Sequence, residues 1–177
     1  MRLLVTGGTG VLGRAFRPLA EAEGHQVSAP GRAELDLFDP AAVGARMRGV
    51  DAVLHLATRI QPLEAMGQPG AWRENDRLRA EASPYLVDAA LAAEEQAARF
   101  AAAGRHGVAL RLGLLDGPGT GHDQPNPALG ASLHTVDAGR ALLAALTVPS
   151  GIYNVCRDGE RVSHRRFTEA TGWRPRH

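Results

Sequence analysis

Short apolar runs alternate along the chain with stretches of helical periodicity. Residues 2–6 form a brief apolar run that ends in glycines, which is typical of a buried parallel strand. Residues 10–23 carry apolar side chains at helical spacing, and Gly24 predicts the end of that helix. Further strands are predicted at 25–29, 34–37, 51–57, 107–112 and 152–155, and further helices at 40–48, 71–103, 135–146 and 163–170. This alternation predicts an α/β fold with a doubly wound parallel sheet.

A glycine-rich loop joins the first predicted strand to the first predicted helix. It reads Thr-Gly-Gly-Thr-Gly-Val-Leu-Gly over residues 6–13. In such a loop Gly7 allows a tight turn, Gly10 lets the backbone approach a diphosphate, and Gly13 lets the helix pack closely on the sheet. The start of the helix adds unpaired N–H groups and a partial positive charge. We interpret the loop as the dinucleotide-binding turn of a Rossmann-type domain, rather than as a flexible turn after an edge strand.

The glycine loop resembles the cofactor loop of extended and atypical short-chain dehydrogenases/reductases, the NAD-dependent epimerase/dehydratase group. Other segments resemble that family in the same order along the chain. They are Leu-Asp-Leu at 35–37, Val-Leu-His-Leu-Ala at 53–57, Glu-Asn-Asp at 74–76, Arg-Leu-Gly-Leu-Leu-Asp-Gly-Pro-Gly at 111–119, His-Thr-Val-Asp at 134–137, Gly-Ile-Tyr-Asn-Val at 151–155 and Gly-Trp-Arg-Pro at 172–175. The resemblance therefore spans almost the whole chain, although only the glycine loop is specific by itself.

This resemblance implies a nicotinamide dinucleotide cofactor and a small-molecule substrate. It places Asp36 beside the adenine amino group and the strand end at 53–57 alongside the cofactor riboses, and it matches Asn75 to the Asn of the following helix. The expected cofactor-binding residues are Gly7, Thr9, Gly10, Val11, Leu12, Gly13, Arg32, Asp36, Leu37, Leu56, Ala57, Thr58 and Asn75. The helices at 72–103 match those that pair subunits in relatives, so a homodimer is one prediction.

The residues after the second predicted strand bear on the choice between NADP and NAD. An acidic residue there would accept a hydrogen bond from the ribose 2′-hydroxyl, whereas an arginine accommodates a 2′-phosphate. The chain reads Ser-Ala-Pro-Gly-Arg at 28–32, with no carboxylate before Glu34. Because Arg32 can offer a bidentate guanidinium to a phosphate, NADP is preferred over NAD. The alternative is a solvated loop arginine.

The sequence identifies no catalytic residue. Family dehydrogenases use Tyr-x-x-x-Lys, in which the lysine lowers the pKa of the tyrosine so that its phenol can exchange a proton with the substrate. The chain has two tyrosines, Tyr85 and Tyr153, and all 20 of its Lys and Arg residues are arginine. The Tyr/Lys pair is therefore absent from these 177 residues.

The strand that the family places between its fourth and sixth strands is also absent. Ala90 looks like the end of one helix and Leu91 like the middle of the next. Either the sequence joins segments of a longer chain, at 90/91, 123–129 and 170/171, or the deletion is real. The first alternative gives an NAD(P)-dependent epimerase, dehydratase or reductase acting on a small substrate such as a nucleotide sugar. The second gives a non-catalytic redox sensor or regulator, so enzymatic activity stays uncertain.

Length, composition and charge limit the number of domains, the kinds of partner and the kinds of site that the chain can have. A length of 177 residues suits one domain over 1–177, with a small substrate-side lobe from 116–134 and 156–177. The net charge of +1 offers no attraction to nucleic acid or to a membrane surface. The first strand leaves no room for a signal peptide, so a cytoplasmic location is expected. The single cysteine and the spacing of the seven histidines predict no metal site.

Four other residues are candidates for a structural or a functional role. His134 and Asp137 could face a substrate, but helix capping and packing are the preferred interpretation. His55 ends a predicted buried strand and is expected to be a packed, hydrogen-bonded core residue. Trp72 is equally compatible with a substrate mouth and with a plain surface loop.

Overall fold

The computed structural model describes residues 1–59, 67–82, 85, 108–125, 131–158 and 162–177. The chain divides into two compact units. The first comprises Met1–Gly10 and Gln26–Gly104, and the second comprises Val11–His25 and Arg105–His177. The single domain expected from the sequence, with its substrate-side lobe, stays a prediction.

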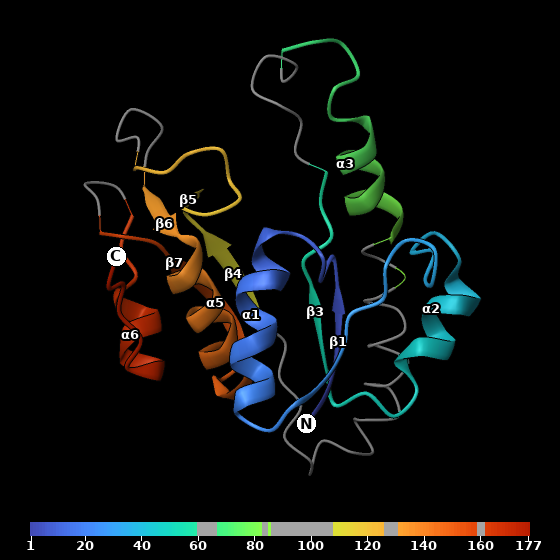
Figure 1. Cartoon of the computed structure of the whole chain (residues 1–177), viewed down its shortest axis with the longest axis horizontal. Helices are drawn as coiled ribbons and strands as arrows, with labels where there is room; N and C mark the ends of the chain where they lie inside the picture. Colours follow the sequence, from blue (N-terminus) through green and yellow to red (C-terminus); the bar gives the residue numbers. More distant parts are fainter. Residues whose placement is uncertain (60–66, 83–84, 86–107, 126–130, 159–161) are drawn as a thin grey trace. The chain divides into compact units, whose positions relative to one another are not determined.

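The first unit is built on a three-stranded parallel sheet in the order β2–β1–β3, of which β1 and β3 are labelled in Figure 1. The strands are β1 (Arg2–Thr6), β2 (Gln26–Ser28) and β3 (Ala52–His55). In the central strand, Leu3, Leu4 and Val5 are each 1% exposed. A strand buried on both faces is favoured by a continuous apolar run, which is why the sequence predicted β1 correctly.

Helix α2 (Pro40–Met47) begins where the sequence predicted it. The Asp39 side chain accepts hydrogen bonds from the Ala41 and Ala42 amides, and Pro40 takes the first helical position, where it has no N–H to leave unpaired. Helix α3 (Arg73–Arg77) continues into one π-helical turn at Leu78–Ala82. The rest of the helices predicted at 71–103, and the position 90/91, lie outside the described residues except for Tyr85.

The strand predicted at 34–37 is wrong. Gly31 donates its N–H to the Glu34 carboxylate at 2.8 Å, and Phe38 donates to Asp36 at 2.9 Å. These side chain–backbone hydrogen bonds give the segment turns in place of a strand ladder. Leu35 is nevertheless buried, and it packs with Val43 of α2.

The second unit holds two further parallel strand pairs. Strand β4 (Val108–Leu112) pairs with β7 (Gly151–Val155), and β5 (Leu114–Asp116) pairs with β6 (Ser132–His134). Its helices are α1 (Val11–Ala22), α5 (Thr135–Ala144), a 3₁₀ turn (Ala145–Thr147) and α6 (Arg165–Thr171). Strands β5 and β6 were not predicted, and position 170/171 lies inside the continuous helix α6.

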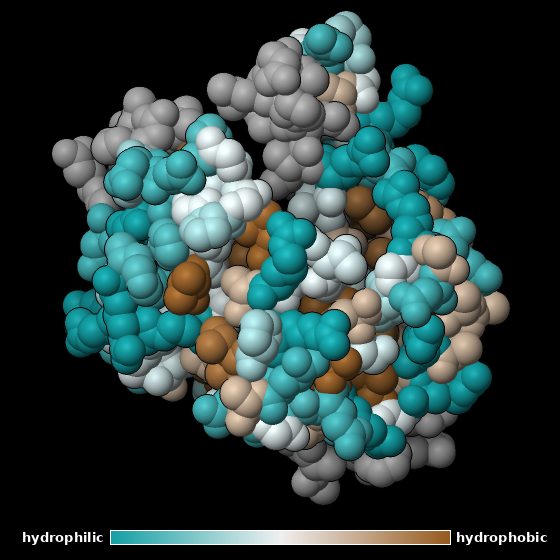
Figure 2. All heavy atoms as spheres, in the orientation of Figure 1, coloured by the Kyte–Doolittle hydropathy of each residue, from teal (hydrophilic) through white to brown (hydrophobic). Residues whose placement is uncertain are grey.

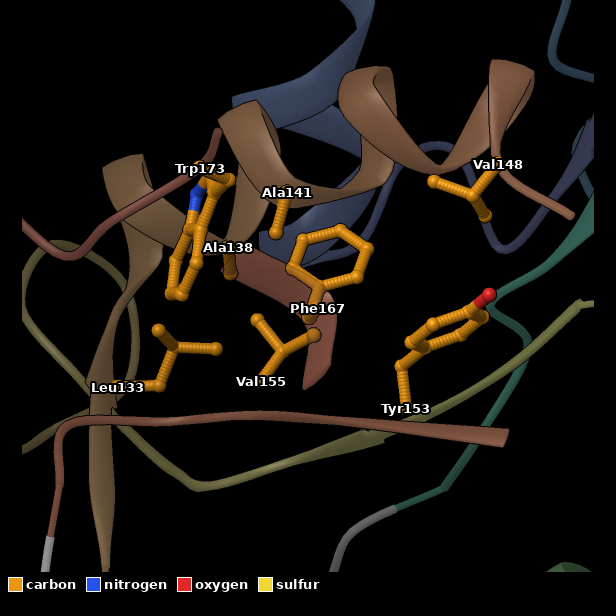
Figure 3. Close-up of a cluster of buried hydrophobic side chains, with 8 residues drawn as sticks. All are labelled: Leu133, Ala138, Ala141, Val148, Tyr153, Val155, Phe167 and Trp173. Carbon is orange, nitrogen blue, oxygen red and sulfur yellow. The ribbon is translucent and has the colours of Figure 1, made fainter. Parts of the chain in front are cut away.

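Aromatic and aliphatic side chains from α5, α6 and the strands form the core of the second unit (Figure 3). Phe167 is fully buried and makes edge-to-face contacts with Tyr153 and Trp173, each at 5.6 Å between ring centroids. Helix α1 packs on α5 closely enough that a Cβ on Gly139 would lie 2.7 Å from the Ala15 carbonyl oxygen. The position of α1 is therefore set by a backbone contact with α5.

All strand pairs in the described sheets are parallel, so the predicted α/β class is confirmed. Figure 2 shows that hydrophilic side chains cover most of the visible face, with hydrophobic ones in small separate groups. In the described part of the chain no helix combines the length and the apolar character that crossing a membrane requires.

Candidate functional site

The glycine loop begins at the carboxyl end of β1. Gly7 has φ +70°, a left-handed conformation that favours glycine, and its carbonyl oxygen accepts the Gly10 N–H at 2.9 Å. A Cβ on Gly7 would lie only 2.6 Å from the Ala57 nitrogen and 2.7 Å from the Leu56 carbonyl carbon. Any side chain at position 7 would therefore collide with the backbone that leaves β3.

The next residue is held just as closely on the other side of β1. A Cβ on Gly8 would lie 2.5 Å from the Ala29 Cβ and 3.2 Å from the Val5 carbonyl oxygen. The loop is thus enclosed by the backbone after β3 on one side and by Ala29, directly after β2, on the other. The close packing at Gly7 and Gly8 explains why the loop carries glycine at both positions.

Helix α1 begins at Val11, directly after Gly10 in the chain. The first amides of a helix have no partner inside it, and they point toward the N-terminal end together with the positive end of the helix dipole. No acidic residue lies in the first turn of α1, so nothing there neutralises that charge. Within this helix the predicted cofactor residue Gly13 is buried. Val11 and Leu12 occupy the first turn, and Leu12 also packs on the hydrophobic core of the second unit.

Asn75 holds the segment that follows β3. Its Oδ1 accepts hydrogen bonds from the Thr58 hydroxyl and the Arg59 amide, each at 2.8 Å. Its Nδ2 donates to the Arg59 carbonyl at 2.6 Å, and the residue is only 3% exposed. The amide of Asn75 therefore pairs with Arg59 in the way a neighbouring strand would, which keeps Ala57 and Thr58 beside the glycine loop.

The residues expected at the adenosine end lie in the turns after β2. Arg32 is 76% exposed on its side chain, and its Nη2 lies 3.5 Å from Glu74 Oε1, a long and weak ion pair. Asp36 is exposed but accepts the Phe38 amide, whereas Leu37 packs partly on the Leu35–Val43 cluster. Part of the Leu37 side chain therefore packs in the core. The side chains of Arg32 and Asp36 are exposed and can contact a ligand.

The carboxyl ends of β1 and β3 are linked by side chains. Thr6 Oγ1 and His55 Nδ1 are 2.6 Å apart. The residue His55 is exposed, so the expectation of a core histidine is wrong, although its hydrogen bond was predicted correctly. Protein atoms that displace water from part of the ring lower the pKa of His55. Neutral imidazole is therefore favoured at this strand end.

A second group of polar residues, which no pattern in the sequence predicted, lies at the strand ends of the second unit. Asp116 ends β5 and forms a bidentate ion pair with Arg157, at 2.6 and 3.1 Å. Arg157 also donates to the Ser132 hydroxyl and, at 2.8 Å, to the main-chain oxygen of His177. The hydrogen bond from Arg157 lowers the pKa of Asp116, which is 3% exposed. The partners are 41 residues apart, so no local pattern could have revealed them.

His134 and Asp137 have the structural roles that the sequence favoured. His134 is the N-cap of α5, and its Nδ1 accepts the Val136 N–H at 3.3 Å. The fully buried Asp137 accepts the amides of Arg176 and His177 at 2.8 and 2.9 Å, and it pairs with Arg140 at 3.0 Å. Burial alone would raise the pKa of Asp137, but these amide hydrogen bonds keep it below the usual value. Asp137 therefore stays ionised and fastens the last residues of the chain.

Trp72 and metal binding are the two remaining expectations from the sequence. Trp72 is 38% exposed and lines an open hollow along α3 with Arg73 and Asp76, so both of its interpretations stay open. Among the described residues, no three His, Cys, Asp or Glu side chains gather closely enough to hold a metal ion.

Comparison with known proteins gives the chain's relatives. A family model described as the RmlD substrate binding domain matches residues 1–96. A short-chain dehydrogenase/reductase superfamily protein from Agrobacterium tumefaciens with bound NAD superposes with a TM-score of 0.72 at 17% identity, over 100% of this chain and 93% of that one. No curated protein sequence matches the chain.

Two further solved structures extend the comparison. A UDP-glucose-4-epimerase from Stenotrophomonas maltophila, with bound NAD and formylated UDP-arabinopyranose, gives a TM-score of 0.66 at 15% identity, over 100% and 94% of the two chains. RMD from Pseudomonas aeruginosa, complexed with NADPH, gives 0.59 at 20% identity, over 99% and 92%. The predicted Rossmann-type α/β fold is thereby confirmed.

Proposed function

Because the chain belongs to the family of the RmlD substrate binding domain, we propose that it is an NAD(P)-dependent oxidoreductase that acts on a nucleotide-linked sugar. The resemblance to short-chain dehydrogenases/reductases is likewise confirmed by the solved structures that it matches. The proposal adds to this family membership a cofactor, a reaction class and a substrate class.

One observation supports the cofactor most directly. Gly7 has a positive φ, and a Cβ there would lie 2.6 Å from the backbone of Ala57. The positive φ and the close approach each require glycine at this position. Gly7 directly follows a strand and lies four residues before a helix, which is where the backbone of this fold binds a diphosphate. The residues present therefore fit a dinucleotide.

In this proposal the chain's own residues bind and orient the cofactor. The amides of Val11 and Leu12, in the first turn of α1, would hold the diphosphate. Thr9 and Gly10 would lie beside it in the turn, where Gly10 donates its own N–H to Gly7 and lets the backbone approach. Leu56, Ala57 and Thr58 would line the ribose side, with Asn75 holding Thr58 in place. The bound nicotinamide dinucleotide supplies or accepts the hydride.

We propose NADP as the preferred form. Arg32 lies four residues after the end of β2, and its side chain is 76% exposed. Its ion pair with Glu74 is 3.5 Å long, so a phosphate that accepts two hydrogen bonds from the guanidinium would displace it readily. The carboxylate of Glu34 is turned to the Gly31 amide and is not free to accept a ribose hydroxyl.

The substrate class rests on the similar structures. UDP-N-acetylglucosamine 4-epimerase, UDP-glucose-4-epimerase and dTDP-4-dehydrorhamnose reductase are among them, and each name contains a nucleotide-linked sugar. Their sequence identities of 15–18% establish the fold alone. A nucleotide-linked hexose is therefore the first substrate class to test.

A second function is favoured by a specific observation. The chain contains no lysine, so the Tyr/Lys pair that exchanges protons in family dehydrogenases is absent. A protein that binds the dinucleotide without turnover would act as a sensor of the cofactor or as a regulator. Both functions require cofactor binding. Only the oxidoreductase also converts a substrate, so a measurement of turnover distinguishes the two.

Fluorescence titration of the protein with NADPH and NADH tests the shared step. Gly7→Ala should weaken binding of both by about 5–30-fold, since holding a Cβ in the left-handed conformation of the binding loop costs about 1–2 kcal/mol. Gly44→Ala is the matched control, because Gly44 lies in α2 and nothing approaches its Cβ position within 4 Å. Unchanged affinity in Gly7→Ala would contradict the assignment of the loop.

A further inference from the structure

Hydride transfer to or from a sugar carbon needs a partner for the hydroxyl proton, and the chain's tyrosines are poor candidates for that task. Tyr153 is 3% exposed and donates its hydroxyl to the Pro149 carbonyl oxygen at 3.0 Å. In Figure 3 this hydroxyl points toward Val148, inside the core cluster. Tyr85 packs partly on the Leu35–Val43 cluster. Another group must therefore exchange the proton if the proposed oxidoreductase function is correct.

We propose that His177 is that acid/base group, oriented by Asp137 and stacked on His134. The proposal rests on the oxidoreductase function proposed above, and it adds a residue for the proton. His177 Nδ1 lies 3.4 Å from Asp137 Oδ1, and the two imidazole rings are stacked with centroids 4.7 Å apart and planes at 20°. The His177 side chain is 48% exposed, so about half of its surface is open to a ligand.

Asp137 sets the tautomer of His177. Its side chain is fully buried and ionised, and its Oδ2 accepts both amide hydrogen bonds from the segment that carries the imidazole, which leaves Oδ1 for Arg140 and His177 Nδ1. A carboxylate beside Nδ1 favours the form in which Nδ1 carries the proton and Nε2 has a free lone pair. This arrangement resembles the Asp–His part of a hydrolytic triad, in which the carboxylate orients the base without being protonated itself.

His134 and Arg157 hold the imidazole in place. Because His134 Nδ1 accepts the Val136 N–H, its ring is fixed at the start of α5, and the His177 ring lies against it. Arg157 donates to the main-chain oxygen of His177, and the charge of Arg157 is balanced by Asp116. Among the described residues, the titratable and charged groups in contact with His177 include Asp137, paired with Arg140, Arg157, paired with Asp116, and the stacked His134.

The histidine pair lies near the start of α1, within the same unit. A Cβ on Gly117 would lie 2.6 Å from His134 Cδ2, and a Cβ on Gly119 would lie 3.4 Å from Val11 Cγ2. Two residues of chain span roughly 7 Å. The loop at 117–119 therefore contacts both places. One end lies against the stacked imidazoles, and the other lies against the first turn of α1, where the cofactor's diphosphate is proposed to bind.

The proton then follows a balanced path. In the oxidative direction the substrate hydroxyl gives its proton to His177 Nε2, and the carbon that bears the hydroxyl gives a hydride to the oxidised nicotinamide dinucleotide. The carbon becomes a carbonyl carbon, and the imidazolium afterwards releases its proton to water. In the reductive direction each transfer is reversed, with the imidazolium protonating the carbonyl oxygen.

Steady-state kinetics test the role in the full chain, with UDP- and dTDP-linked hexoses and their 4-keto forms as probes and NADPH absorbance as the readout. His177→Gln should lower kcat by about 10²–10⁴-fold, leave cofactor affinity unchanged and remove one ionisation from the pH profile of kcat. Added imidazole should restore part of the rate. His25→Gln, at the opposite end of α1 from the loop, is the control and should behave as wild type. An unaltered kcat and pH profile in His177→Gln would overturn the proposal.

A measurement without turnover keeps the two proposals separable. Nitrogen-15 NMR of the histidine rings should show His177 with a protonated Nδ1 and an unprotonated Nε2, and addition of NADPH should shift its resonances but not those of His25. A protonated Nε2, or no response to NADPH that binds, would refute the role of His177. If NADPH binds and shifts His177 but no nucleotide sugar is turned over, the assigned substrate class fails instead.

Discussion

Substituting Gly139 by alanine tests whether the position of α1 governs cofactor binding. Gly139 lies on α5, and a Cβ there would lie 2.7 Å from the Ala15 carbonyl oxygen, 2.9 Å from its carbonyl carbon and 3.2 Å from its Cβ. Ordinary van der Waals contact begins near 3.4 Å, so α1 must move away by about 0.7 Å. The nearest atoms belong to backbone, which cannot rotate aside as a flexible side chain could.

Two opposing effects set the size of the change. Overpacking of this kind costs about 1–3 kcal/mol, whereas replacing glycine by alanine inside a helix gains up to about 1 kcal/mol. We therefore expect a net loss of about 1–2 kcal/mol in the free energy of unfolding, or a fall in Tm of about 2–8 °C for a chain of this size. The affinity for NADPH should fall as well, because the first turn of α1 moves with the helix.

Denaturant unfolding and fluorescence titration of Gly139→Ala would measure both effects. Gly44→Ala supplies the matched comparison, since the same substitution in open space should stabilise the protein. Adding Ala15→Gly to Gly139→Ala should restore little, because the closest contact is with the Ala15 carbonyl group. Equal stabilisation by Gly139→Ala and Gly44→Ala would refute the reasoning.

Three other predictions concern single contacts. Arg32→Ala should weaken NADPH binding by about 10–100-fold and leave NADH within about twofold in a fluorescence titration, and equal losses for both would end the NADP preference. Asn75→Ala removes three hydrogen bonds and should cost about 2–3 kcal/mol in urea unfolding, and a loss below about 0.5 kcal/mol would contradict the clamp. The pKa of Asp116 is lowered in the folded state, so the Arg157 pair stabilises the protein above the ordinary carboxyl value of 3.8 and loses that contribution as pH falls through the depressed folded value. The stability difference between wild type and Asp116→Asn should therefore shrink in acid, and a pH-independent difference would refute this linkage.

The parts of the fold that sequence predicted well carry their signal within a few residues. The run that became β1 is apolar throughout because both of its faces are buried, and Asp39-Pro40 caps α2 through bonds to residues two and three positions away. Gly7 has a left-handed backbone conformation and lies against the backbone of Ala57. Glycine is the residue type that fits both requirements, so the sequence predicts it clearly.

The errors arise where distant contacts decide the structure. Leu35 predicted a strand because it is apolar, but its partner is Val43 of α2, and the polar residues around it bond to nearby amides. Strands β5 and β6 have three residues each, too few for a period to be seen, and β6 runs directly into α5 without a turn residue. The polar group of Asp116 and Arg157 depends on pairing between segments far apart in sequence.

The absence of lysine also has a quantitative consequence for the choice between enzyme and sensor. Removing a positioned acid/base group from an oxidoreductase typically costs about 10²–10⁴ in rate, because water must then exchange the proton. A chain that binds the cofactor but has no such group would still transfer hydride slowly, with a rate that follows hydroxide or hydronium concentration and shows no protein ionisation. A chain that uses the Asp137–His177 pair would show an ionisation that disappears in His177→Gln. The pH dependence of turnover therefore discriminates between the two functions even when the rate itself is low.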